Sequence, residues 1–157
     1  MSTEANKALV RRWWEEMWNK GNMSILDEVV AVDYDGHPSP TEVDFGRGPE
    51  GQKKLVAFYR GAFPDTHMTI EHMVAEGDMV ALRWRATGTH TGELMGIPPS
   101  GRRAEVTGTQ IVRVADGKLA EGWGNFDALG MMIQIGAIPM PGQNFGEPPA
   151  AERERAM

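Results

Sequence analysis

The stretch Gly88-Thr-His-Thr-Gly-Glu-Leu-Met-Gly-Ile-Pro-Pro-Ser-Gly101 separates two long segments that alternate as β-strands do. In residues 79–89, apolar side chains occupy one face of an extended chain and arginines the other, and residues 103–114 also alternate. The apolar face of the first segment consists of Val80, Leu82, Trp84 and Ala86. Glycines and a Pro-Pro pair mark the stretch between the segments as a loop. We therefore predict two neighbouring strands connected by this loop.

Two further strands are predicted outside this pair. Residues 67–75 precede the turn Glu76-Gly77-Asp78, and residues 118–126 follow Asp116-Gly117, a dipeptide typical of tight hairpins. The four segments together predict an antiparallel meander.

The first half of the chain has helical periodicity instead. Apolar residues recur at helical spacing from Glu4 to Lys20 and from Ser24 to Ala31, and Gly48-Pro49 opens a third helix that Pro64 ends. A short helix is expected after Asp127. Helices followed by a meander predict an α+β fold in which a curved sheet wraps the N-terminal helices around a pocket.

Composition limits the possible functions. The 157 residues suit one domain, and the chain has no cysteine for disulfides or thiol chemistry. A formal net charge of −6 with scattered basic residues argues against a nucleic-acid partner. No apolar run approaches the roughly 20 residues that span a bilayer, so we expect no membrane association and a soluble cytoplasmic protein. Eleven Met and five Trp suit either an ordinary core or an adaptable apolar cavity.

Three motifs carry a family resemblance: the Gly88–Gly101 loop, Arg113-Val-Ala-Asp-Gly-Lys118, and Asp127-Ala-Leu-Gly-Met-Met-Ile-Gln-Ile-Gly136. In these motifs and their order the chain resembles the SnoaL-like polyketide (ester) cyclases of the nuclear-transport-factor-2-like superfamily. The resemblance implies a cone-shaped curved antiparallel sheet around the helices, forming a single domain over residues 1–138. Residues 139–157 are rich in Pro and Gly and are expected to form an irregular tail.

The resemblance also implies an activity. The cyclases close a ring by an intramolecular aldol reaction without metal or cofactor: a base removes an acidic carbon-bound proton, and the pocket holds the enolate. An ungapped comparison anchored on residues 113–118 places the family's catalytic His at Gln110 and its Asp at Gly124. Neither residue can act as a base, although Gln110 can still hydrogen-bond an oxygen.

Other residues are candidates for the missing base. The family pocket draws on the segment after the second helix, where many relatives have a histidine, so the resemblance suggests His37, which alternatively only fixes its loop. Asp127 is expected to cap the last helix and is the alternative base. His90 is interpreted as a loop-fixing residue rather than a catalytic one, and Glu121 is expected to point away from the cavity.

The apolar faces of helices and strands converge on the predicted pocket. Its expected lining is Trp14, Tyr59, Trp84, Val106, Val112 and Asn125. Trp14 could equally belong to the core beneath the floor. Glycines 108, 122 and 124 on the concave face indicate either relief for a bent sheet or a cavity enlarged for a bulky ligand.

Three functions follow, in order of preference. The first is a cofactor-free enzyme on a small apolar carbonyl substrate, with His37 as base and Gln110, together with Asn125, binding oxygen. The second is a non-catalytic small-molecule-binding or accessory protein. The third is an epoxide-hydrolase-like hydrolase or a dehydratase: the epoxide hydrolases resembled use an Asp-Arg-Asp set, part of which Arg83 with Asp127 or Asp35 would imitate. A homodimer through the outer sheet face is expected from the resemblance and from Trp123 on that face.

Overall fold

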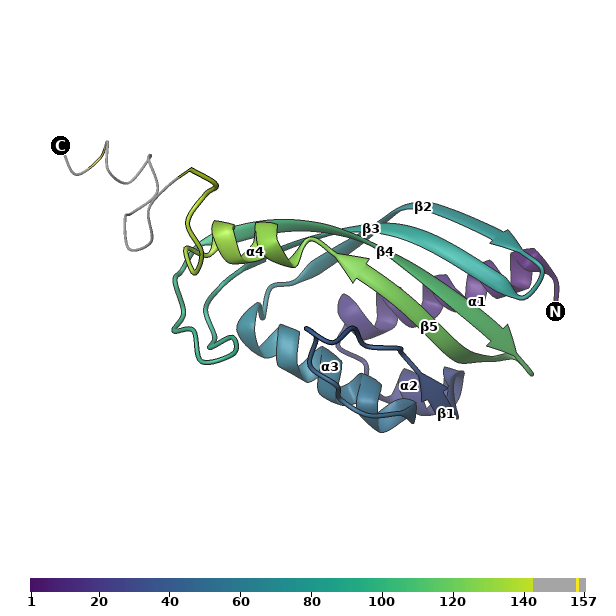
Figure 1. Ribbon diagram of the computed structural model, residues 1–157. Helices are drawn as coiled ribbons and strands as arrows, with labels where there is room; N and C mark the ends of the chain where they lie inside the picture. Colours follow the sequence, from purple (N-terminus) through teal and green to yellow (C-terminus); the bar gives the residue numbers. More distant parts are fainter. Residues whose placement is uncertain (143–154, 156–157) are drawn as a thin grey trace.

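The computed structural model describes residues 1–142 and 155. Its elements form a long curved sheet with helices on the concave side (Figure 1). The predicted irregular tail lies outside the described residues, except for residues 139–142 and 155.

The helices on the concave side follow the predicted apolar periodicity. α1 spans Thr3–Trp18, and its N-cap is Ser2, whose hydroxyl accepts a hydrogen bond from the backbone N–H of Ala5 at 3.1 Å. α2 spans Ser24–Val29, and α3 spans Gly48–Ala62 with a proline in its first turn. α4, Ala128–Gln134, follows the last strand at one end of the sheet (Figure 1).

The predicted meander is confirmed. Its strands are β2 (His67–Glu76), β3 (Met79–Thr89), β4 (Arg103–Ala115) and β5 (Lys118–Phe126). They pair in sequence order, each antiparallel to the next. Asp116 and Gly117 both adopt positive φ in the turn between β4 and β5, the conformation that this type of hairpin needs.

One strand was missed from the sequence. The predicted second helix runs to Ala31, but α2 ends at Val29 and the chain continues as β1, Val30–Asp35. β1 pairs parallel with β5, so the sheet is mixed, with strand order β1-β5-β4-β3-β2, rather than wholly antiparallel. The β-branched residues Val30 and Val32 favour this extended conformation, and pairing supplies backbone partners to the edge of β5.

The core lies between the helices and the concave face. It includes the fully buried Trp13, Met17 and Leu26 from the helices and Val80, Val112 and Leu119 from the strands. The opposite, convex face bears ion pairs such as those of Arg83 and Arg85 with Glu71. Among the described residues, no helix is long and apolar enough to cross a bilayer.

The Gly88–Gly101 loop seats against the end of α3. The backbone N–H groups of Thr91 and Gly92 both donate to the carbonyl of Ala62, at 3.1 Å. A Cβ on Gly92 would lie 1.9 Å from the carbonyl oxygen of Gly61, so this close approach requires glycine. His90 is fully buried, and its Nδ1 accepts a hydrogen bond from the Ser100 N–H at 3.1 Å. The interpretation of His90 as a loop-fixing residue is confirmed.

Candidate functional site

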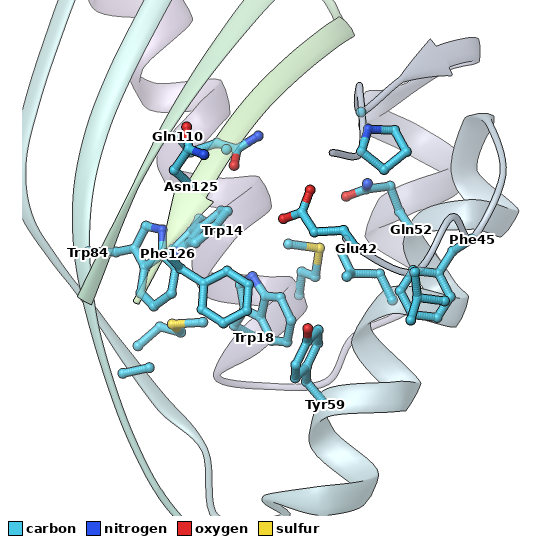
Figure 2. A pocket seen from close by; sticks show the side chains of 18 of the residues that line it. Trp14, Trp18, Glu42, Phe45, Gln52, Tyr59, Trp84, Gln110, Asn125 and Phe126 are labelled. Atoms are coloured by element: carbon cyan, nitrogen blue, oxygen red, sulfur yellow. The ribbon is translucent and has the colours of Figure 1, made fainter. Parts of the chain in front are cut away.

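A cavity of about 560 Å³ opens between the concave face of the sheet, α1, α3 and the segment 36–47 that connects β1 to α3. Figure 2 shows an aromatic wall on the sheet side and side chains of α3 and the 36–47 segment opposite it. The predicted residues Trp14, Tyr59, Trp84, Val106, Gln110, Asn125 and His37 all line this cavity. Most of the predicted site is therefore brought together.

Aromatic rings form a continuous wall. The ring centroid of Trp14 lies 5.8 Å from that of Trp84, and Trp84 lies 6.3 Å from Phe126. Tyr59 on α3 meets Phe126 edge-on at 6.0 Å and Trp18 at 6.4 Å. Such a wall suits a flat, ring-containing ligand, because planar groups stack on or meet these rings edge to face.

The concave-face glycines make room for neighbouring side chains. A Cβ on Gly108 would lie 2.4 Å from Cζ2 of Trp84, and one on Gly124 would lie 2.1 Å from Oε1 of Gln110. A Cβ on Gly122 would lie 2.3 Å from the Tyr34 hydroxyl oxygen and 2.8 Å from Nε2 of Gln110. The missing side chains therefore admit an indole, a phenol and an amide to the cavity wall.

Gln110 and Tyr34 form the polar part of this wall. Gln110 and Gly124 are directly opposite each other in the β4–β5 ladder, and the Gln110 side chain lies over the glycine. Neither the Gln110 amide nor the Tyr34 hydroxyl hydrogen-bonds another described residue. Burial, and secondarily the charge of Asp35, raises the pKa of Tyr34 well above its usual range, so its hydroxyl stays protonated and can donate.

Further unpaired polar atoms lie around the cavity. The indole N–H groups of Trp14 and Trp18, each 5% exposed, have no hydrogen-bond partner among the described residues. The same holds for the side-chain oxygen of Gln52 on α3, which is 9% exposed. Buried polar groups are normally paired, so these atoms are suited to an occupant that offers both acceptors and a donor.

His37 lies at the rim of the cavity. Its Nε2 is 2.8 Å from Oε2 of Glu121, its Nδ1 is 3.8 Å from Oδ2 of Asp35, and its ring stacks on Trp123 with centroids 4.9 Å apart. The hydrogen bond from His37 and then that from Arg113 lower the pKa of Glu121. Glu121 is not part of the cavity lining.

The segment 36–47 forms the outer wall of the cavity. Arg47 pairs with Asp35 at 3.0 Å, which closes the segment at its base, and Phe45 packs on Phe58 of α3 at 5.3 Å. Glu42 lies within this segment, and its carboxylate points into the cavity (Figure 2). Tyr59 lies near enough for Glu42 to contribute, after burial, to a raised Tyr59 pKa.

Two predicted site residues lie elsewhere. Asp127 is the N-cap of α4, accepting the Gly130 N–H at 2.8 Å as expected of a cap, and it does not line the cavity. Val112 is fully buried in the core below the cavity wall. Arg83, the arginine of the predicted hydrolase alternative, is bound to Glu71 outside the cavity.

Sequence reasoning missed Tyr34, Glu42 and Gln52. Tyr34 depended on recognising β1, for which the β-branched run from Val30 was the available signal. The segment of Glu42 has no periodicity, and Gln52 is a single polar residue on an otherwise ordinary helix face. Among the described residues, no group of three or more His, Asp or Glu side chains could hold a metal ion.

Comparisons with known proteins agree with this architecture. The profile of the SnoaL-like polyketide cyclase family matches residues 8–135. The nogalonic acid methyl ester cyclase of Streptomyces nogalater is 30% identical over 122 residues, which cover 76% of this chain and 89% of the cyclase. The aklanonic acid methyl ester cyclase of Streptomyces peucetius is 29% identical over 137 residues, covering 87% of this chain and 92% of that cyclase.

Solved structures show the same fold. TsrD from Streptomyces laurentii superposes with a TM-score of 0.78 at 29% identity, covering 88% of this chain and 99% of TsrD. A putative SnoaL-like polyketide cyclase from Jannaschia sp. CCS1 gives 0.77 at 27% identity, covering 87% of this chain and 95% of that protein. The fold and cavity define an α+β protein of the nuclear-transport-factor-2-like type. Within that class, the chain belongs to the SnoaL-like polyketide cyclase family.

Proposed function

We propose that the protein is a cofactor-free cyclase that closes a ring in a polyketide-like carbonyl compound by an intramolecular aldol reaction. The main support is the pairing of an aromatic cavity with the unpartnered donors of Gln110 and Tyr34. Donors that already face a developing negative oxygen need no reorganisation during the reaction, and each such donor commonly contributes about 10²–10³ in rate. Asn125, which also lines the cavity, extends the polar wall.

The reaction needs no second reactant. A base takes the acidic carbon-bound proton, and the electrons of the C–H bond become the enolate, whose oxygen is held by Gln110 and Tyr34. The enolate carbon then forms a bond to a second carbonyl carbon of the same molecule. The resulting alkoxide regains a proton, so substrate and product are isomers. His37 stays the predicted base from the sequence, with Glu121 as its hydrogen-bond partner.

Methyl esters of polyketide acids are the substrates to try first, because the two curated relatives above are named as cyclases of such esters. The test is incubation of the purified protein with nogalonic and aklanonic acid methyl esters, followed by chromatography and mass spectrometry. We expect a ring-closed isomer of unchanged mass to form from at least one ester, and Gln110→Leu to slow its formation. Saturable binding with no isomer formed would refute the proposed activity.

A binding or accessory role is the second candidate. It is favoured by one observation, the presence of Gln110 and Gly124 where the family resemblance places the catalytic His and Asp. A binder should hold an aromatic ketone with an affinity that Gln110→Leu lowers, and it should return the ligand unchanged. Quenching of the Trp14 and Trp84 fluorescence would measure that binding.

A further inference from the structure

Carboxylates at the cavity differ in how they are engaged. Among the described residues, three carboxylates line it: Asp35, Glu42 and Asp44. Asp35 is neutralised by Arg47 at 3.0 Å and also accepts the His37 N–H, and Asp44 accepts the Gly46 N–H at 2.9 Å within its own turn. Neither Glu42 nor Asp44 forms an ion pair with a described residue, and each has one oxygen without a described partner, but it is the Glu42 carboxylate that Figure 2 shows pointing into the cavity.

The direction of Glu42 is set by its own segment. Its Oε2 accepts the backbone N–H of Ser39 at 2.6 Å, which leaves Oε1 available. Figure 2 shows the carboxylate projecting from the 36–47 segment toward the side of the cavity that bears Gln110 and Asn125.

The segment that carries Glu42 is held at both ends. At its start, His37 binds Glu121 and stacks on Trp123. At its end, a Cβ on Gly51 would lie 2.1 Å from the Gly46 carbonyl oxygen, so the chain packs directly on the first turn of α3. A carboxylate anchored in this way keeps its position relative to the sheet, as a proton-transfer group requires.

We propose that Glu42 is the residue that takes the carbon-bound proton from the ligand and returns it to the alkoxide, and that His37 is a positioning residue for the Glu42 segment. This inference rests on the proposed function. The C–H electron pair passes into the enolate while the proton moves to Oε1 of Glu42. After the new C–C bond forms, the same proton goes to the alkoxide oxygen, so Glu42 ends as a carboxylate again. Gln110 and Tyr34 hold the oxygen meanwhile.

The competing base, His37, is less suitably arranged. Its Nε2 is engaged by Glu121, and its Nδ1 faces Asp35. A base must be within hydrogen-bond reach of the proton that it removes. Both ring nitrogens of His37 therefore face carboxylates, at 2.8 Å from Nε2 and 3.8 Å from Nδ1.

The decisive measurement is hydrogen–deuterium exchange at the acidic carbon of aklanonic acid methyl ester in D₂O, followed by NMR with and without protein. Glu42→Gln keeps an oxygen to accept the Ser39 N–H but cannot accept the proton. We expect it to slow both exchange and cyclisation on the order of a hundredfold, with ester binding unchanged. Glu50→Gln, an exposed change on α3 outside the cavity, should leave both rates unaltered.

His37→Gln separates the two assignments. We expect it to weaken binding and slow cyclisation only several-fold, because it loosens the segment while Glu42 remains. Full exchange activity in Glu42→Gln together with its loss in His37→Gln would overturn the assignment. An ester that binds to the wild type without hydrogen–deuterium exchange and without cyclisation would refute the proposed function. The assignment of Glu42 as the base would then be refuted as well.

A second readout does not depend on turnover. Alizarin, a flat hydroxylated anthraquinone, changes colour when a hydroxyl ionises. A neighbouring carboxylate disfavours the anionic dye, so bound alizarin should be more strongly ionised in Glu42→Gln than in the wild type at the same pH. This shift would place Glu42 against the ligand even if no ester cyclises. Identical spectra for the two bound dyes would refute that placement.

Discussion

Gly108→Ala should destabilise the protein, although alanine is intrinsically the better residue in a strand. The added Cβ would lie 2.4 and 2.7 Å from two atoms of the Trp84 indole and 2.8 Å from Cβ of Phe126. Carbon atoms in contact normally lie about 3.5–4.0 Å apart, so the indole must move by roughly 1 Å. Trp84 is 8% exposed and packs between Trp14 and Phe126, so the indole cannot shift without disturbing the aromatic wall.

The magnitude follows from two opposing terms. Overpacking a core typically costs about 1–3 kcal/mol, and replacing a strand glycine by alanine recovers roughly 0.5–1 kcal/mol. The expected net loss in the free energy of unfolding is about 1–2 kcal/mol. Gly124→Ala is the matched control, because the three atoms nearest to its Cβ all belong to the flexible end of the Gln110 side chain. Moving that side chain to a less favourable rotamer costs about 0.5–1.5 kcal/mol, and the gain from replacing a strand glycine by alanine largely offsets this cost.

Urea unfolding followed by far-ultraviolet circular dichroism measures the free energy of unfolding of both variants. The comparison requires that the slope of this free energy against urea concentration is the same in each variant as in the wild type. We expect Gly108→Ala to be clearly less stable and Gly124→Ala to stay within about 0.5 kcal/mol of the wild type. The packing account is refuted if Gly108→Ala is as stable as the wild type, or if Gly124→Ala costs as much as Gly108→Ala.

Three further predictions concern the cap, acid stability and assembly. Asp127→Ala should lower the free energy of unfolding by about 1 kcal/mol in urea titrations while Asp127→Asn retains the cap and turnover; an inactive but folded Asp127→Asn would instead move the base to the start of α4. The pKa of Asp65 lies below its ordinary 3.8 because the Thr89 N–H and then the Thr89 hydroxyl bind it. The ionised Asp65 therefore stabilises the folded protein fully above the ordinary aspartate pKa, and this stabilisation is lost as pH falls through the lowered pKa. The free energy of unfolding of Asp65→Asn should be below that of the wild type at pH 6, and the difference should disappear in acid unfolding titrations. We expect a homodimer through the convex face, where Trp123 is 37% exposed, and a monomer in light scattering at micromolar concentration would contradict this.

The strands were predictable because their alternation is strong and local. The meander follows from residues 67–126 and from a turn dipeptide whose backbone preference is specific. β1 was not predictable in this way, because its partner β5 lies almost 90 residues further along the chain. The short apolar run of β1 also fits the end of a helix. Only pairing in space decides between those two conformations.

The cavity was partly predictable for the same reason. Trp14, Trp84 and Val106 fall on the inward faces of regular elements, so periodicity identifies them. Val112 shares that face but lies where the core is closed, which depends on the curvature of the sheet rather than on alternation. Glu42 belongs to a segment without repeating structure, and its direction is set by a hydrogen bond from Ser39 and by contacts at either end of the segment.

The position of Gln110 over Gly124 also constrains how this chain could change over generations. A side chain at position 124 and the present glutamine compete for one space, so their effects on fitness are coupled. A lineage that acquired Asp at 124 would have to displace the amide, and a His at 110 would have to turn away from the same space. Any mutational path toward a His and Asp pair on these facing strands therefore requires the side chain at position 110 to leave the space above position 124.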